Sequence, residues 1–296
     1  MKNKTDWLAI ASAQQKNQNS WLCVGLDPDF ERMPAEFARN ESGIYYFCRS
    51  VIESVAPFCS AFKPQFAHFA GQRALGALEQ ICHDIRKIFP SHQLILDVKR
   101  GDIDSTARFY AREAFEVYRA HSCTLHPYMG WDSISPYLEM GDQYGVFILC
   151  RTSNPSGSMW QSLPCRPTEN EDLSVPLFEL IAKWVNSQSK IYRQLGLVAG
   201  ATHPDELSKI KGIASDLPLL IPGIGAQGGD LEQTLQTCLR LNTSQEFIAP
   251  TWINSSRAIL YPVIAQNESW QNACVREARK VNDQINQIRF AYQKIT

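Results

Sequence analysis

The chain has 296 residues, of which 44% are hydrophobic and 20% are charged, a composition typical of a globular protein with a sizeable core. The formal net charge of −1 predicts no general affinity for nucleic acid or for an anionic membrane, so a phosphorylated ligand would need a local site. Residues 1–18 lack the apolar region of a signal peptide, and no apolar run is long enough to span a bilayer. We therefore expect a cytoplasmic protein without membrane segments.

Alternating apolar runs and helical patterns predict the fold. Near-continuous apolar strands separated by helices favour a parallel sheet covered by helices, and eight such units favour a closed (β/α)8 TIM barrel. An open doubly wound sheet is the alternative, which six strands would favour. The expected strands are residues 21–26, 60–64, 93–99, 123–127, 145–150, 195–200, 219–223 and 247–254. The helical patterns between them include residues 44–57, 72–89, 106–119, 177–193 and 231–241.

Three further segments are additional to the eight strand–helix units of a minimal barrel. Residues 6–17 predict an extra helix before the first strand, and residues 266–293 predict C-terminal helices. Residues 151–174 form a long polar, proline-containing loop after the fifth strand, of a length usually found in functional loops. No linker interrupts the pattern, so we expect one domain over residues 1–296.

The cysteines and histidines argue against disulfides and metal sites. The nine cysteines include no C-x-x-C pair, and Cys23, Cys123 and Cys150 lie inside apolar runs. They are typical of reduced, buried side chains in a cytoplasmic protein. The six histidines show no metal-ligand spacing, so we expect no metal.

Charged residues gather where the predicted strands end, which is where barrels of this class carry their functional residues. A single charge there is usually a solvated rim residue, but several on one rim favour a site. The residues concerned are Asp27, Lys63, Asp97, Lys99, His126 and Arg257.

The third strand gives the clearest chemical signal. Side chains alternate along a strand, so Ile95, Asp97 and Lys99 share one face and are expected to point toward the barrel axis. Asp102 follows in the turn, and carboxylates on both sides favour the ammonium form of Lys99. That form suits a proton donor better than an amine nucleophile. A salt bridge that only closes the barrel rim is the alternative.

The segment after the seventh strand predicts a phosphate site. Residues 222–229 read PGIGAQGG, and glycines let backbone N–H groups approach an anion closely. A helix starting near Asp230 would add its positive end, and Arg257 could add a charged contact. A tight turn without a ligand is the alternative.

Residues 97–103, DVKRGDI, resemble the D-x-K-x-x-D-I signature of orotidine 5′-monophosphate decarboxylases, in the form typical of the second, mostly bacterial subgroup. Other stretches resemble further motifs of that family in the same order along residues 21–262. They are GLDP at 25–28, FKP at 62–64, TSNP at 152–155, PGIGAQGG at 222–229 and SSR at 255–257. The segment 159–170 matches no motif.

The resemblance implies a cofactor-free enzyme of pyrimidine biosynthesis that converts orotidine 5′-monophosphate to uridine 5′-monophosphate (UMP) and CO2. It implies that Lys99 protonates C6 of the pyrimidine, with Asp97 beside the departing carboxylate. It also implies a homodimer in which Asp102 reaches the site of the partner subunit, with Ile103 and Thr106 nearby.

The remaining roles implied by the resemblance concern substrate binding. Lys63 and Asp27 contact the ribose hydroxyls, and Lys63 also joins the charged network. Ser153 bonds the pyrimidine edge, and Pro222 lines the pocket. Gly225, Gln227 and Arg257 hold the phosphate.

Two other functions remain open at this point. One is a metal-dependent decarboxylase or aldolase of the same barrel superfamily that acts on sugar phosphates, against which the Ser153 motif and the long loop argue. A magnesium requirement would favour it. The other is a non-catalytic nucleotide-binding barrel, which would keep the glycine-rich segment but would not need Lys99.

Overall fold

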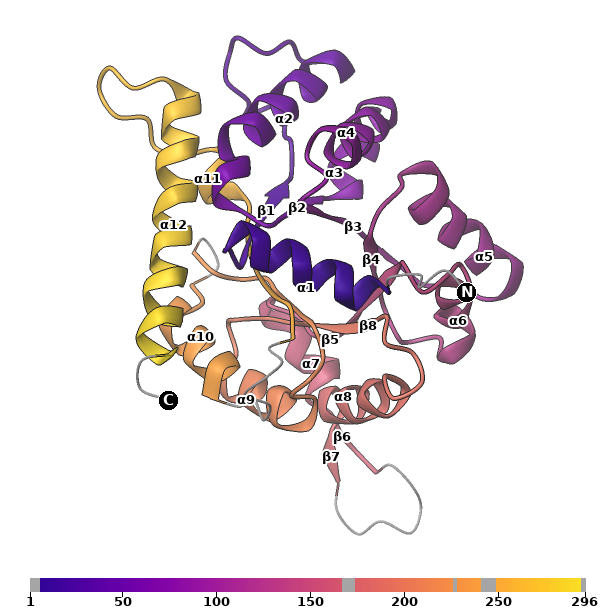
Figure 1. Cartoon of the computed structure of the whole chain (residues 1–296). Coiled ribbons are helices and arrows are strands. Elements are labelled where there is room, and N and C mark those ends of the chain that lie inside the picture. The colour runs from indigo at the N-terminus through magenta and orange to yellow at the C-terminus, as the bar shows by residue number, and fades with distance from the viewer. Residues whose placement is uncertain (1–5, 167–173, 226–227, 241–248, 294–296) are drawn as a thin grey trace.

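The computed structural model describes residues 6–166, 174–225, 228–240 and 249–293. Within them, eight parallel strands form a closed barrel in the order β1-β10-β9-β8-β5-β4-β3-β2 (Figure 1). Because β1 pairs with both β10 and β2, the predicted TIM barrel is confirmed and the open sheet is excluded. The strands are β1 (Leu22–Leu26), β2 (Ala61–Pro64), β3 (Gln93–Arg100), β4 (Ser122–Leu125), β5 (Gly145–Arg151), β8 (Leu195–Ala199), β9 (Leu219–Ile221) and β10 (Thr251–Ser255).

Helices surround the barrel and connect successive strands. The longer ones are α2 (Glu41–Val55), α4 (Leu75–Ile88), α5 (Asp104–Arg112), α8 (Leu177–Gln188), α9 (Pro204–Ile213) and α10 (Leu231–Arg240). Short helices add α3 (Phe66–Ala70), α6 (Ser135–Leu138), α7 (Ser158–Gln161) and α11 (Arg257–Leu260). A π-helical turn, Glu113–Val117, continues α5, so the helix predicted at 106–119 changes type halfway.

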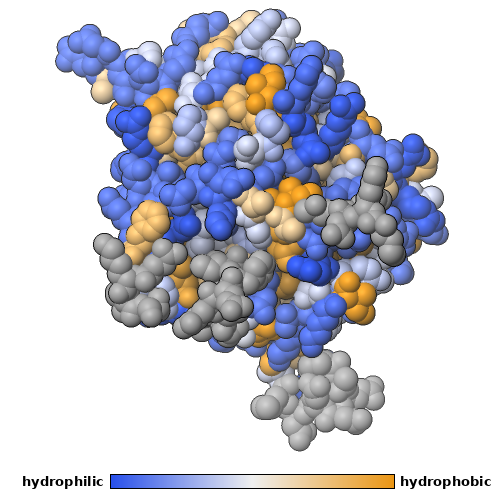
Figure 2. Space-filling view, viewed as in Figure 1, coloured by the Kyte–Doolittle hydropathy of each residue, from blue (hydrophilic) through white to orange (hydrophobic). Residues whose placement is uncertain are grey.

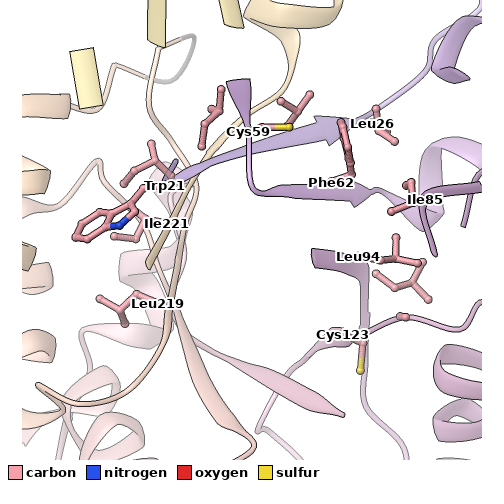
Figure 3. Packing of buried hydrophobic residues seen from close by; sticks show 14 of the residues in the cluster. Trp21, Leu26, Cys59, Phe62, Ile85, Leu94, Cys123, Leu219 and Ile221 are labelled. Carbon is pink, nitrogen blue, oxygen red and sulfur yellow. The ribbon is translucent and has the colours of Figure 1, made fainter. Parts of the chain in front are cut away.

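The outer faces of the strands pack against the helices. Phe62 of β2 and Leu94 of β3 lie next to Ile85 of α4, and all three are fully buried (Figure 3). The amphipathic face of α4 therefore covers these strands, as the 3.6-residue spacing of its apolar residues predicts.

The extra N-terminal helix, α1 (Trp7–Gln18), closes the amino end of the barrel and crosses in front of the strands in Figure 1. Trp7 is fully buried among residues that point into the barrel, and its ring packs edge-on against Phe147 with centroids 5.5 Å apart. Its indole nitrogen donates to Gln93 Oε1 at 3.2 Å. A helix was predicted here, and the structure shows that it forms the barrel floor.

The C-terminal helix, α12 (Trp270–Gln293), confirms the last predicted helical region and packs against α2 and α10. The molecular face seen in Figure 2 is largely hydrophilic, with hydrophobic residues in small separate groups. In the described part of the chain, no helix is both long and apolar enough to traverse a bilayer.

Two predicted segments differ from the structure. The eighth strand was expected over 247–254, but it begins at Thr251, directly after Pro250, which has no N–H for the strand ladder. Residues 247 and 248 lie outside the described part. The connection after β5 was expected as a loop, but it contains α7 and a two-stranded antiparallel hairpin, β6 (Pro164–Cys165) and β7 (Val175–Pro176). These elements are too short to produce a periodic pattern in the sequence.

Candidate active site

A cavity of about 370 Å³ opens at the carboxyl ends of the barrel strands, within the size range of small-molecule sites. Seven of the predicted site residues line it, namely Asp27, Lys63, Asp97, Lys99, Ser153, Pro222 and Arg257. The prediction that strand-end charges meet at one rim is therefore confirmed for the five charged residues among them.

Asp97 is the centre of the charged cluster. Its Oδ2 accepts a hydrogen bond from Lys63 Nζ at 2.7 Å, and its Oδ1 accepts one from Lys99 Nζ at 2.5 Å. Thr124 Oγ1 also donates to Oδ1 at 2.8 Å, and Gln65 Nε2 donates to Oδ2 at 3.3 Å. The carboxylate is thus fixed in one orientation between two ammonium groups.

The two lysines differ in their exposure to solvent. The side chain of Lys63 is 5% exposed, whereas that of Lys99 is 44% exposed. Lys63 therefore belongs to the wall of the cavity, and the ammonium of Lys99 is accessible to a molecule that enters it.

The charges of this cluster are mutually stabilised. Burial alone would raise the pKa of Asp97, but Lys63 and Lys99 outweigh it and hold that pKa well below its usual range. Burial alone would lower the pKa of Lys63, but Asp97 and Asp27 outweigh it and raise that pKa above its usual value. Asp97 and Lys63 both remain ionised near neutral pH.

The backbone at Lys99 departs from strand geometry. Its φ of +45° lies in the left-handed region, and the pairing of β3 with β4 shifts register between Leu96 and Arg100. The Lys99 amide donates to a side chain of the neighbouring strand β4, Thr124 Oγ1, at 3.0 Å. Such a backbone conformation costs a lysine about 1–2 kcal/mol. It occurs at the residue whose Nζ donates to Asp97.

Two buried acceptors face this end of the barrel and receive no hydrogen bond from any residue that the structure describes. They are Oδ1 of Asp27, directly after β1, and Oδ1 of Asn254 on β10. An unpaired buried acceptor costs roughly 1–3 kcal/mol, so both oxygens favour a ligand that brings donors such as hydroxyl groups.

Residues 222–224, which follow β9, the seventh strand of the barrel, form another side of the cavity. Gly223 and Gly225 have positive φ values of 105° and 79°, which only glycine adopts without strain. Gly223 and Ile224 line the cavity, whereas Gly225 does not, and Gln227 lies outside the described residues. Helix α10 begins one residue after Asp230, as predicted.

Arg257 is the first residue of α11 and is exposed at the cavity. Across residues 6–166, 174–225, 228–240 and 249–293, it forms no ion pair with a carboxylate. Its guanidinium is thus available to an anionic ligand.

Besides Gly225, three predicted site residues do not line the cavity of their own chain. Asp102 is half-buried, and its Oδ1 accepts a hydrogen bond from the Ile103 amide at 2.8 Å. The side chains of Ile103 and Thr106 are exposed, at the start of α5. His126 does not line the cavity either.

Several cavity residues were not singled out from the sequence, in particular Gln65, Thr124 and Asn254. Thr124 had a usable signal, because it lies two residues before His126 in an apolar run and so shares the face of that strand end. Gln65 and Asn254 are neutral amides that resemble ordinary loop residues. Among the described residues, no group of three or more His, Cys, Asp or Glu side chains is arranged to hold a metal ion.

Comparison with known proteins identifies the family. The model of the orotidine 5′-phosphate decarboxylase / HUMPS family matches residues 20–261. A protein of Bordetella avium named orotidine 5′-phosphate decarboxylase is 48% identical over 92% of this chain and 95% of its own length. A protein of the same name from Ralstonia pickettii is 45% identical over 95% of this chain and 97% of its own length.

Solved structures agree with these relatives. The orotidine 5′-monophosphate (OMP) decarboxylase of Leishmania donovani superimposes with a TM-score of 0.79 at 30% identity, covering 96% of this chain and 99% of that one. Motifs, barrel and charged cavity therefore agree with these relatives: the chain belongs to the orotidine 5′-phosphate decarboxylase / HUMPS family and, within it, to the orotidine 5′-phosphate decarboxylases, which are carboxy-lyases of pyrimidine biosynthesis.

Proposed function

We propose that this cavity is where the chain converts orotidine 5′-monophosphate to UMP and CO2, and that Lys99, Asp97, Lys63 and the partner's Asp102 carry the reaction. The observation that supports these roles most directly is the Asp97 carboxylate held between Lys63 and Lys99, with Lys99 accessible from the cavity. The sugar-phosphate alternative is not favoured, because the close relatives over nearly the whole chain bear the decarboxylase name.

The substrate would lie across the cavity with its phosphate toward α11 and its base toward Ser153. Arg257 would bind the phosphate together with Gly225 and Gln227, and Pro222 would line the pocket. Asp27 and Lys63 would bind the ribose hydroxyls. The unpaired Oδ1 of Asp27 supports this orientation, because a ribose hydroxyl supplies the donor that it lacks.

The chemistry follows from the charges. The bond from C6 to the carboxyl carbon breaks, CO2 leaves, and the electron pair stays on C6. The ammonium of Lys99 stabilises that negative charge and then donates its proton to C6, which gives UMP and a neutral amine that solvent reprotonates. Asp97 lies beside the departing carboxylate and keeps Lys99 oriented.

The active unit is proposed to be a cytoplasmic homodimer with shared sites. Asp102, Ile103 and Thr106 do not line the cavity of their own chain, so their proposed roles require a second copy. In that arrangement Asp102 completes the charged network of the partner subunit.

The direct test is a decarboxylation assay with purified protein, followed by the absorbance of orotidine 5′-monophosphate in the presence of a chelator. Full activity with the chelator is expected, because every proposed role belongs to a residue of the protein and none requires a metal ion. Loss of activity that magnesium restores would instead support the metal-dependent alternative.

A further inference from the structure

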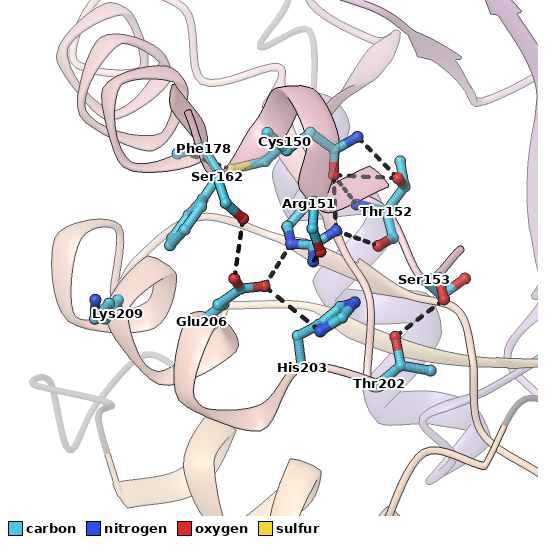
Figure 4. Close-up of polar contacts among 12 residues, drawn as sticks. Cys150, Arg151, Thr152, Ser153, Ser162, Phe178, Thr202, His203, Glu206 and Lys209 are labelled. Atoms are coloured by element: carbon cyan, nitrogen blue, oxygen red, sulfur yellow. Dashed lines mark hydrogen bonds and ion pairs between the residues drawn. The ribbon is translucent and has the colours of Figure 1, made fainter. Parts of the chain in front are cut away.

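Arg151, the last residue of β5, is an arginine whose side chain is only 1% exposed. A buried guanidinium must place its N–H groups on acceptors. Nη1 donates to Thr152 O and to Gln161 Oε1, both at 3.0 Å, and Nη2 donates to Ser158 Oγ at 2.8 Å. Nε donates to Glu206 (Figure 4). Four of its five N–H groups are thereby accounted for.

These acceptors lie on two different strand connections of the barrel, which Arg151 links. Ser158 and Gln161 belong to α7, in the connection after β5, and Glu206 belongs to the first turn of α9, after β8. Ser162 Oγ also donates to Glu206 Oε1 at 3.3 Å. The buried arginine thus anchors α7 to the barrel, next to the segment 152–154 that lines the cavity.

Gln161 also holds Thr152 directly. Its Oε1 accepts a hydrogen bond from the Thr152 amide at 2.9 Å, and its Nε2 donates to Thr152 Oγ1 at 2.8 Å. Together with the bond from Arg151, the Gln161 amide fixes the residue immediately before Ser153.

Ser153 is held from its other side by the connection after β8. Thr202 Oγ1 donates to Ser153 O at 3.1 Å (Figure 4). A Cβ at Gly200 would lie 2.8 Å from Ser153 N and Cα, so the glycine permits the close approach of the two segments. The backbone of Ser153 therefore has little freedom, although Ser153 follows the end of a strand.

We propose that Gln161 is a positioning residue that holds Ser153 in the orientation needed to bind the pyrimidine base. This inference rests on the proposed role of Ser153, and it assigns a task to a segment that matches no family motif. Gln161 contacts Thr152 and Arg151 and does not line the cavity, so it acts through the geometry of residues 152–153. The phosphate contacts lie on other segments and do not depend on it.

The test compares two ligands, UMP and ribose 5-phosphate, which lacks the base. Gln161→Ala should weaken UMP binding about tenfold, since several hydrogen bonds to the segment are lost, and should leave ribose 5-phosphate binding within about twofold of the parent. Gln161→Glu keeps the acceptor for Arg151 and for the Thr152 amide and should restore most of the UMP affinity. Met159→Ala, which changes a 70% exposed neighbour on α7, is the matched control and should bind both ligands normally.

Thr202→Val provides an independent second variant, because it removes the other bond to Ser153 while keeping the side-chain shape. It should also weaken UMP selectively, because the Ser153 backbone is then held from one side only. If Gln161→Ala does not fold, Gln161→Met, which keeps the side-chain length and removes the amide, replaces it with the same expected loss of UMP binding. The proposal is overturned if the Gln161 variant binds UMP like the parent, whatever Thr202→Val does, or if it loses both ligands equally. Ser153→Ala tests the proposed role of Ser153 separately. Unchanged UMP binding in that variant would show that the Ser153 side chain does not bind the base.

Discussion

Lys99 combines a left-handed backbone conformation with a direct hydrogen bond to Asp97. We expect Lys99→Ala to lower kcat by at least about a thousandfold, because it removes both the stabilising charge and the proton donor. The steady-state rate of decarboxylation measures this. Lys183→Ala, which changes an exposed lysine on α8, is the matched control, and unfolding curves of both variants check the fold. Activity of Lys99→Ala within tenfold of the parent would contradict the role of Lys99.

Arg257 is proposed to bind the substrate phosphate. Arg257→Ala should weaken UMP binding by about tenfold to a hundredfold, the range expected for a lost charged hydrogen bond, and should hardly change uridine binding. Arg257→Lys should fall between, since it keeps the charge but loses the two-pronged contact. Isothermal titration with both ligands measures the difference. Equal losses for UMP and uridine would indicate that Arg257 supports the structure instead.

The extent to which single residues could be predicted depended on their chemistry. Charged side chains at strand ends, such as Lys63 and Asp97, are conspicuous because charge is rare inside a barrel, and the structure brings them together. Thr124 and Gln65 bind the same carboxylate, but neutral polar residues are common in any loop or strand. The left-handed backbone at Lys99 left no trace in the sequence, because lysine has no preference for it.

At the scale of the element, periodic segments were predictable and contacts between elements were not. The strands and longer helices followed from their apolar patterns, whereas α7 and the β6-β7 hairpin were too short to leave one. The helix at 6–17 was predicted, but not that it forms the barrel floor, because its apolar residues contact strands distant in sequence.

The floor helix α1 should contribute to stability and not to catalysis. Trp7→Ala should lower the free energy of unfolding by about 3–5 kcal/mol, the usual cost of deleting a buried tryptophan. It should leave kcat/KM within about threefold, because the floor lies at the opposite end of the strands from the cavity. Denaturant unfolding and steady-state kinetics measure the two effects. Trp160→Ala, which changes a 66% exposed tryptophan, is the control for stability, and an equal loss in both would contradict the role of Trp7.

At the scale of the whole molecule, the position of Asp102 bears on the active unit. It follows Lys99 by three residues, yet only Lys99 lines the cavity of this chain. If two copies meet around a two-fold axis, each site takes Asp97 and Lys99 from one chain and Asp102 from the other. A monomer would then lack part of its charged network.

Complementation between two inactive variants tests this arrangement. Lys99→Ala and Asp102→Ala should each be nearly inactive as homodimers. After subunit exchange, a mixed dimer has one site with both changes and one intact site. Random exchange makes about half of the dimers mixed, so about a quarter of the parental activity per site should return. Native mass spectrometry confirms that exchange has occurred, and a mixture of either variant with itself is the control. If exchange is complete and no activity returns, Asp102 acts within its own chain and the sites are not shared.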